Sequence, residues 1–199
     1  MKNLLKDRSH WLEVWARFRT GNQLAFSEIY EEFIDRLMAY GSKITRDREL
    51  VKDCIQDIFI DLYRLQPDLR NPEYIEFYLF KSLKNSIVRK AQKDKKLKSL
   101  SEEEMIVFDL NIDVDRDVFD LESDQLRIER LKSIVQTLDP QKRELLFLKF
   151  NSEMNYNEIG QLLNINPDAA KKQVYRLLDQ IREKYGVQLL ELFVILKKG

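Results

Sequence analysis

The fold is decided by one stretch: YNEIGQLL at 156–163, NIN at 164–166 and PDAAKKQVYRLL at 167–178. Its spacing predicts two helices joined by a three-residue turn, a helix-turn-helix. In the first helix Ile159, Leu162 and Leu163 face a core, and Gly160 allows a close approach of the second helix. In the turn, Ile165 fills the corner between the helices and Asn166 caps the second helix. Pro167 takes the first helical position, where a missing N–H costs nothing.

The second helix of this stretch has one apolar and one polar side. We expect Ala170, Val174, Leu177 and Leu178 to point inward. The outward residues are then Asp168, Ala169, Lys171, Lys172, Tyr175 and Arg176. A helix fits the major groove of DNA, where cations reach phosphates or guanine edges, and a helix N-terminus attracts phosphate. This outward face is therefore a candidate DNA-binding surface, and the alternative is a solvated helix of an ordinary bundle.

The composition indicates an all-α protein with helical domains. The 199 residues are 44% hydrophobic and 34% charged, with only five glycines and four prolines, and strands and turns usually need more of both. The single cysteine, Cys54, excludes an internal disulfide, and the first residues lack the apolar core of a signal peptide. The apolar run at 187–196 is too short to span a bilayer. We therefore expect a cytoplasmic protein without a membrane segment.

The net charge is zero, but the charges are unevenly distributed along the chain. Between Lys81 and Lys98, eight basic residues face one acid, Asp94. The segment that follows is strongly acidic and has no sustained helical pattern, which predicts a linker at 99–122.

Helical spacing of apolar residues divides the remaining chain into two domains. Four helices precede the linker, with apolar sets that begin at Trp11, Phe26, Leu50 and Tyr74. We predict a first domain at 7–98, the acidic linker at 99–122, a second domain at 123–186 and a C-terminal extension helix at 187–199.

The third predicted helix places polar residues along one side. Asp53, Gln56 and Asp57 share that side with Ile60, while the apolar side is formed by Ile55, Ile58, Phe59 and Leu62. Taken alone, this polar side is either a solvated face or a binding surface for helices of another protein.

The order of an acidic and amide-containing helix, a basic aromatic helix and a terminal helix-turn-helix resembles the extracytoplasmic-function group of sigma factors, in the sigma-70 family. The resemblance covers about 21–98 and 124–185. Four quoted stretches carry it: GNQLAFSEIY at 21–30, DRELVKDCIQDIF at 47–59, LFKSLKNSIVRK at 79–90 and LDPQKREL at 138–145. They resemble the opening of sigma region two, its polymerase-docking segment, its promoter-reading helix and the start of region four.

This resemblance implies roles for named residues. Asp53, Gln56, Asp57 and Phe59 would hold the clamp of core RNA polymerase, Phe59 chiefly through packing. Asn85, with Lys81, Lys84 and Arg89, would lie along the melted promoter strand, where a cationic track and an aromatic pocket suit phosphates and an extruded base. Tyr74, Phe77, Tyr78 and Phe80 are candidates for that pocket, or for the core. The partners implied are core polymerase, promoter DNA and a candidate anti-sigma factor.

The sequence departs from the family pattern at two places. Tyr78-Leu79 replaces a tryptophan-leucine pair, and Asp168 lies on the otherwise basic recognition face, so the promoter sequence cannot be transferred. Two added segments, the helix with Trp11 and Trp15 and the stretch 189–196, either bind an anti-sigma factor or pack within the chain.

The motifs that would indicate catalysis are absent from the sequence. It contains no glycine-rich phosphate loop, no metal-ligand cluster and no nucleophile with a nearby base, and we interpret His10 and Cys54 as structural. We therefore expect neither an enzyme nor a cofactor. Two other functions stay open: a helix-turn-helix regulator that binds DNA without docking on polymerase, and a helical adaptor that binds only proteins.

Overall fold

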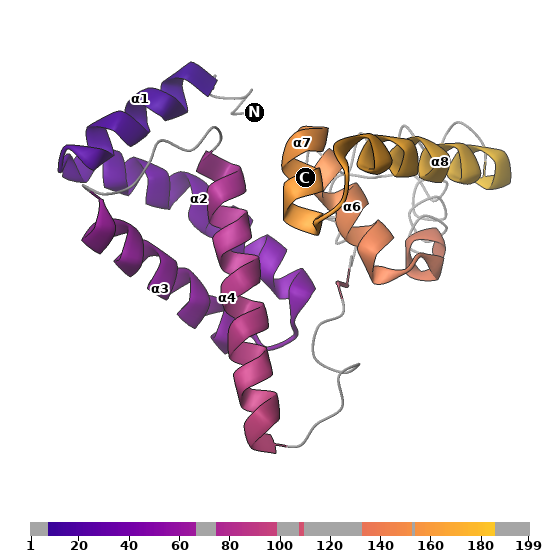
Figure 1. Ribbon diagram of the computed structural model, residues 1–199, viewed down its shortest axis with the longest axis horizontal. Helices are drawn as coiled ribbons and strands as arrows, with labels where there is room; N and C mark the ends of the chain where they lie inside the picture. The colour runs from indigo at the N-terminus through magenta and orange to yellow at the C-terminus, as the bar shows by residue number, and fades with distance from the viewer. Residues whose placement is uncertain (1–7, 67–74, 99–107, 110–132, 153, 186–199) are drawn as a thin grey trace, which may run out of the picture. The chain divides into compact units, whose positions relative to one another are not determined.

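The structure is a computed structural model that describes residues 8–66, 75–98, 108–109, 133–152 and 154–185, and leaves the side chains of 8, 94–98 and 185 undescribed. Within these ranges every regular element is a helix, so the predicted all-α fold class is confirmed. The chain divides into two compact units between residues 107 and 108. Each unit is described by itself (Figure 1).

The first unit contains α1 (Arg8–Arg19), α2 (Gln23–Ile44), α3 (Arg48–Leu65) and α4 (Ile75–Lys98). Local capping fixes where two of these helices begin. Asn22 Oδ1 accepts a hydrogen bond from the Ala25 amide at 3.0 Å, and Asp47 Oδ1 accepts one from the Leu50 amide at 3.0 Å. Such side chains satisfy amides that have no partner inside the helix.

Helix α2 is the centre of the first unit, because α1, α3 and α4 all pack against it. The added N-terminal helix packs within the chain: Trp15 is fully buried, with its ring 5.7 Å from that of Tyr78 on α4. Gly41 lies in the last turn of α2, which ends at Ile44. A Cβ at Gly41 would lie 2.5 Å from a Val51 methyl, so this glycine lets α3 approach α2 closely.

The second unit contains a helical stretch at 133–137, followed by α6 (Pro140–Phe150), α7 (Tyr156–Leu163) and α8 (Pro167–Tyr185). Asp139 caps α6 by accepting from the Lys142 amide at 2.9 Å. A capping box begins α7: Asn155 accepts from the Glu158 amide, and the Glu158 carboxylate accepts from the Asn155 amide.

Several predicted features fall outside the described residues. These are most of the acidic linker at 99–122, the first part of the second domain predicted at 123–186, the C-terminal extension at 187–199 and Tyr74. The predicted domain boundaries stay predictions.

Candidate functional site

The turn between α7 and α8 brings the two helices together around Gly160. Asn164 takes the left-handed backbone conformation at φ 55°, and the Ile165 amide donates to the Gly160 carbonyl at 2.9 Å. A Cβ at Gly160 would lie 2.7 Å from the Ile165 carbonyl oxygen. Asn166 Oδ1 accepts from the Asp168 amide at 2.8 Å, which confirms the predicted cap. The helix-turn-helix geometry therefore follows from these few local contacts.

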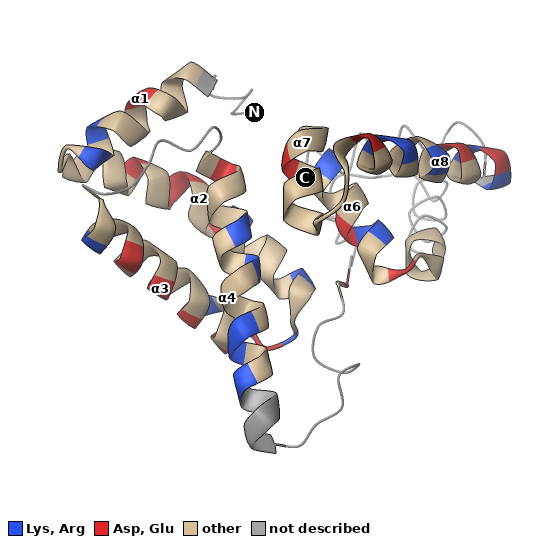
Figure 2. Ribbon diagram, in the orientation of Figure 1, with Lys and Arg blue, Asp and Glu red and all other residues tan. Residues whose placement is uncertain are grey.

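The outward face of α8 lies where the sequence placed it. Asp168, Lys171, Lys172, Tyr175 and Arg176 are exposed, while Ala169 is half-buried. Together with Asp179, the five exposed residues line a shallow hollow of about 410 Å³. The charge of this face is mixed, as the blue and red segments along α8 show in Figure 2. Three cations outnumber two carboxylates here, so the face attracts anions without being uniformly basic.

The opposite side of α8 fixes the orientation of this face. Ala170, Val174, Leu177 and Ile181 are each at most 2% exposed. Between α6 and α7, Lys149 Nζ lies 4.7 Å from the centre of the Tyr156 ring. Burial, and secondarily the nearby Tyr175, raises the pKa of Tyr156. Since the apolar side is held by the core of the unit, α8 presents its polar side as a rigid surface.

The structure confirms that the predicted polar side of α3 faces the solvent. Asp53, Gln56 and Asp57 are exposed. Phe59, predicted with them, is only 4% exposed and lies edge-on to the Tyr30 ring at 4.9 Å. Phe59 therefore supports the neighbouring surface by packing, while Asp53, Gln56 and Asp57 project from that surface.

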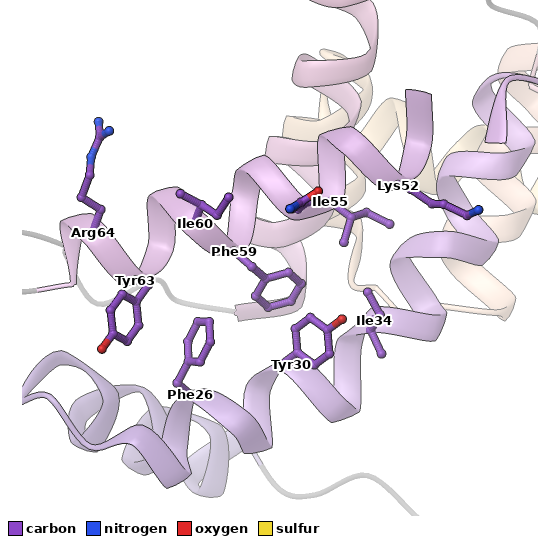
Figure 3. Close-up of a pocket in the computed structure, with 10 residues that line it drawn as sticks. Phe26, Tyr30, Ile34, Lys52, Ile55, Phe59, Ile60, Tyr63 and Arg64 are labelled. Atoms are coloured by element: carbon purple, nitrogen blue, oxygen red, sulfur yellow. The ribbon is translucent and has the colours of Figure 1, made fainter. Parts of the chain in front are cut away.

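An apolar groove runs beside this face, between α2 and α3 (Figure 3). Its volume is about 890 Å³, and Gln56 is among the residues that line it. Three side chains that line it remain largely open to solvent: Tyr30 at 43%, Ile60 at 52% and Tyr63 at 51% exposure. Exposed apolar patches of this kind mark binding surfaces. Sequence reasoning missed the groove, although Ile60 among polar neighbours was a signal for it.

The basic helix α4 presents a second polar surface in the first unit. Lys81, Asn85 and Arg89 are exposed, and Lys84 is half-buried. Lys81 Nζ lies 5.3 Å from the centre of the half-buried Phe77 ring. A cation next to an accessible aromatic ring can contact a phosphate and a base at once.

The other candidate aromatics of α4 turn toward the interior. Phe80 is 1% exposed and stacks on Tyr40 with ring centres 4.7 Å apart. Tyr78 packs on Trp15, and burial raises the pKa of the Tyr78 hydroxyl. Phe77, which lies beside Lys81, is therefore an aromatic side chain that can contact a ligand of this surface.

His10 and Cys54 have structural surroundings. His10 Nε2 lies 2.9 Å from a Glu28 carboxylate oxygen, and that carboxylate also contacts Arg17 at 3.2 Å. Cys54 is fully buried, and burial raises the pKa of its thiol. In the part of the chain that the structure describes, no cluster of three or more His, Cys, Asp or Glu could hold a metal ion. None of the described helices has the length and apolar character needed to cross a membrane.

The relatives that are similar to this chain in sequence are named as RNA polymerase sigma factors. Residues 128–181 match the family model for sigma-70, region 4. The ECF RNA polymerase sigma factor SigM of Bacillus subtilis (strain 168) is 23% identical over 164 residues, which cover 82% of this chain and 96% of SigM. The RNA polymerase sigma factor CarQ of Myxococcus xanthus is 23% identical over 175 residues, covering 88% and 97%.

Two solved structures share the fold. CnrH, in complex with the cytosolic domain of CnrY, has a TM-score of 0.53 at 18% identity, covering 89% of this chain and 96% of CnrH. The sigma factor RpoE of Bartonella quintana, in complex with the anti-sigma factor NepR, has a TM-score of 0.56 at 16% identity, covering 83% and 96%. At identities of 18% and 16%, these two similarities show a shared helical fold and carry no conclusion about function.

Proposed function

We propose that this chain is an extracytoplasmic-function sigma factor of the sigma-70 family, which binds core RNA polymerase and directs it to promoters. One observation carries the proposal: the matched region-four residues, 128–181, include all of α6 and α7 and most of α8, with its exposed basic and aromatic face. In this proposal polymerase catalyses RNA synthesis and the chain performs no chemistry. It works in the cytoplasm, where polymerase and promoters are.

The first unit would dock on polymerase through α3. Asp53, Gln56 and Asp57 offer carboxylate and amide groups to a partner helix, and the apolar groove beside them would take its apolar side chains. This division between a polar surface and an apolar groove is common in helix-in-groove recognition. Because Ile60 is 52% exposed, Ile60→Asp should leave folding intact and weaken binding to core polymerase. Unchanged binding would remove the groove from the docking surface.

The two DNA-facing surfaces would act together. Lys81, Lys84, Asn85 and Arg89 would follow the melted strand, with Phe77 as the adjacent aromatic, while α8 would enter the major groove of duplex farther upstream. With zero net charge, the free chain should bind DNA weakly. Attachment of both units to polymerase raises the effective concentration of each at the promoter, so modest individual affinities suffice.

An anti-sigma factor is a further candidate partner. The support is that Bartonella quintana RpoE forms a complex with the anti-sigma factor NepR. The buried residues of α1 would not serve such a partner, since Trp15 and Phe18 are fully buried within the first unit. The acidic segment 99–122 would connect the docking and duplex-reading units.

In vitro transcription with core polymerase and a promoter library tests the proposal. We expect productive start sites that share two spaced sequence elements, and transcription that depends on the added chain. The rival function, a regulator that does not dock on polymerase, predicts sequence-specific DNA binding by the free chain. It also predicts no association with core polymerase at low salt.

A further inference from the structure

Lys90 of α4 and Asp57 of α3 form an ion pair, with Nζ 2.7 Å from Oδ2. Lys90 ends the stretch 79–90, which resembles the promoter-reading helix, and it belongs to the basic run that begins at Lys81. Asp57 lies on the exposed face of α3 that we propose as the polymerase-docking surface. The pair therefore joins the two surfaces of the first unit that have different proposed partners.

Helix geometry separates Lys90 from the other cations of α4. Lys81 and Lys90 are nine positions apart, which places them about 180° apart around the helix. Leu79 and Leu83, which flank the direction of Lys90, are both fully buried, whereas Asn85 lies near Lys81 and is exposed. A strand that follows Lys81, Asn85 and Arg89 therefore runs along the side of α4 away from Lys90.

A second contact between α3 and α4 lies about one helical turn away from the ion pair. Cys54 and Asp57 are three positions apart on α3, and Ser86 and Lys90 are four apart on α4, so each couple lies on one face of its helix. Cys54 and Ser86 are buried and hydrogen-bonded to each other. The hydrogen bond to Asp57 raises the pKa of Lys90 above its ordinary value of 10.5, as expected for an ammonium that is stabilised by a carboxylate.

The two partners differ in how open they are. The Lys90 side chain is 30% exposed and the Asp57 side chain 54% exposed. A carboxylate can accept about four hydrogen bonds, so Asp57 can hold Lys90 and still receive donors from a docking protein.

We propose that Lys90 is a positioning residue for polymerase docking, which holds the Asp57 carboxylate in place on the docking face and makes no contact with DNA. This inference rests on the proposed function. It means that α4 has two separate roles: one side follows the melted strand, and the other supports the surface that grips the polymerase.

A double-mutant cycle tests the inference, with the dissociation constant of the full chain for core polymerase as the measurement. Lys90→Met keeps the aliphatic stem and removes the charge. Since exposed ion pairs contribute modestly, we expect this variant to raise the dissociation constant about two- to fivefold. The same change in an Asp57→Asn background should have no further effect. Lys90→Arg should restore binding to near the wild-type value.

A second measurement separates docking from DNA contact. With the chain saturating core polymerase, the affinity for a single-stranded promoter oligonucleotide should be unchanged by Lys90→Met and lowered by Lys81→Met. Lys93→Met, which removes an exposed cation of the same helix, is the matched control for polymerase binding. Circular dichroism of each variant reports whether its helices remain folded.

Each alternative result has a definite meaning. If Lys90→Met weakens strand binding and leaves polymerase binding unchanged, Lys90 is a DNA contact and the inference is wrong. An equal effect of Lys90→Met in the Asp57→Asn background would show that Lys90 does not act through Asp57. Absence of any binding between the wild-type chain and core polymerase would overturn the proposed function, and the inference with it.

Discussion

The backbones of Gly160 and Ile165 touch where α7 meets the turn: the Ile165 amide donates to the Gly160 carbonyl at 2.9 Å, and a Cβ at Gly160 would lie 2.7 Å from the Ile165 carbonyl oxygen. A backbone atom cannot move aside as the end of a flexible side chain can. The angle at which α8 leaves the turn therefore depends on a glycine at position 160. This contact connects a local sequence requirement to the orientation of the proposed DNA-reading face.

Gly160→Ala should destabilise the second unit and misplace α8. The added methyl overpacks a site closed by backbone, which typically costs about 1–3 kcal/mol of the free energy of unfolding. Urea unfolding followed by circular dichroism measures this cost. Gln161→Ala, at an exposed position of the same helix, should change stability by less than about 0.5 kcal/mol. Equal stability of the two variants would contradict the packing argument.

Asp53→Lys should weaken binding to core polymerase at least about tenfold, because it places a cation where the partner meets carboxylates. Asp53 is the cleaner position for charge reversal than Asp57, since a lysine at 57 would also repel Lys90. Affinity for core polymerase, measured with the full chain at low salt, checks the prediction. Glu31→Lys, on an exposed position of α2, serves as the control and should bind normally. Undiminished binding by the Asp53 variant would argue for a regulator that acts without docking.

Lys171→Ala should weaken promoter binding by the polymerase complex about equally for different upstream sequences. The plot of log K against log salt concentration has a negative slope, and loss of one phosphate contact reduces its magnitude by about 0.9. A titration of promoter duplex at several salt concentrations measures that slope. Lys184→Ala removes an exposed cation near the far end of α8 and should leave the slope unchanged. If both variants behave alike, the N-terminal half of α8 is not the DNA contact.

The cap of α6 should make stability depend on pH in the acidic range. Burial alone would raise the pKa of Asp139, but its bonds to the Lys142 ammonium and amide lower the pKa below its ordinary value of 3.8. The unfolded chain therefore takes up this proton at a higher pH than the folded chain. The stabilisation is complete above about pH 5 and is lost as the pH falls through the lowered folded value.

Asp139→Asn keeps an acceptor for the cap and removes the charge. We expect the difference in unfolding free energy between wild type and this variant to be largest near neutral pH and to shrink as the pH falls below 3.8 and through the lowered folded pKa of Asp139. Asp139→Ala, which also removes the cap, should cost about 1 kcal/mol more. Unfolding of the full chain in urea at a series of pH values provides the measurement. A difference that persists unchanged at acidic pH would rule out the ion pair as its cause.

The helices and the turn could be predicted from the sequence because their causes are local. The spacing of Ile159, Leu162 and Leu163, the glycine at 160 and the cap at Asn166 all act within a few residues of each other. The same holds for the polar face of Asp53, Gln56 and Asp57, whose exposure follows from helical periodicity. Those side chains project as predicted.

Two features depended on contacts between distant segments. Phe59 and Tyr30 are 29 positions apart, and their packing gives the groove between α2 and α3 its shape. Helical spacing assigned Tyr78 to the core before a DNA pocket, and the structure shows it half-buried against Trp15 of α1, a neighbour that the spacing could not name. Helical periodicity shows which residues share one face of a helix. It does not show which other helix packs against that face.

The sequence by itself determined that the chain is helical, that its end carries a helix-turn-helix and that α3 and α8 have polar outer faces. The tertiary structure decided what the cation on the other side of the basic helix pairs with. Helical spacing alone separates Lys90 from Lys81, but only the packing of α3 against α4 brings Asp57 to the Lys90 ammonium. The physical reason is that an ion pair needs its groups within about 4 Å, and that distance is set by how two helices cross.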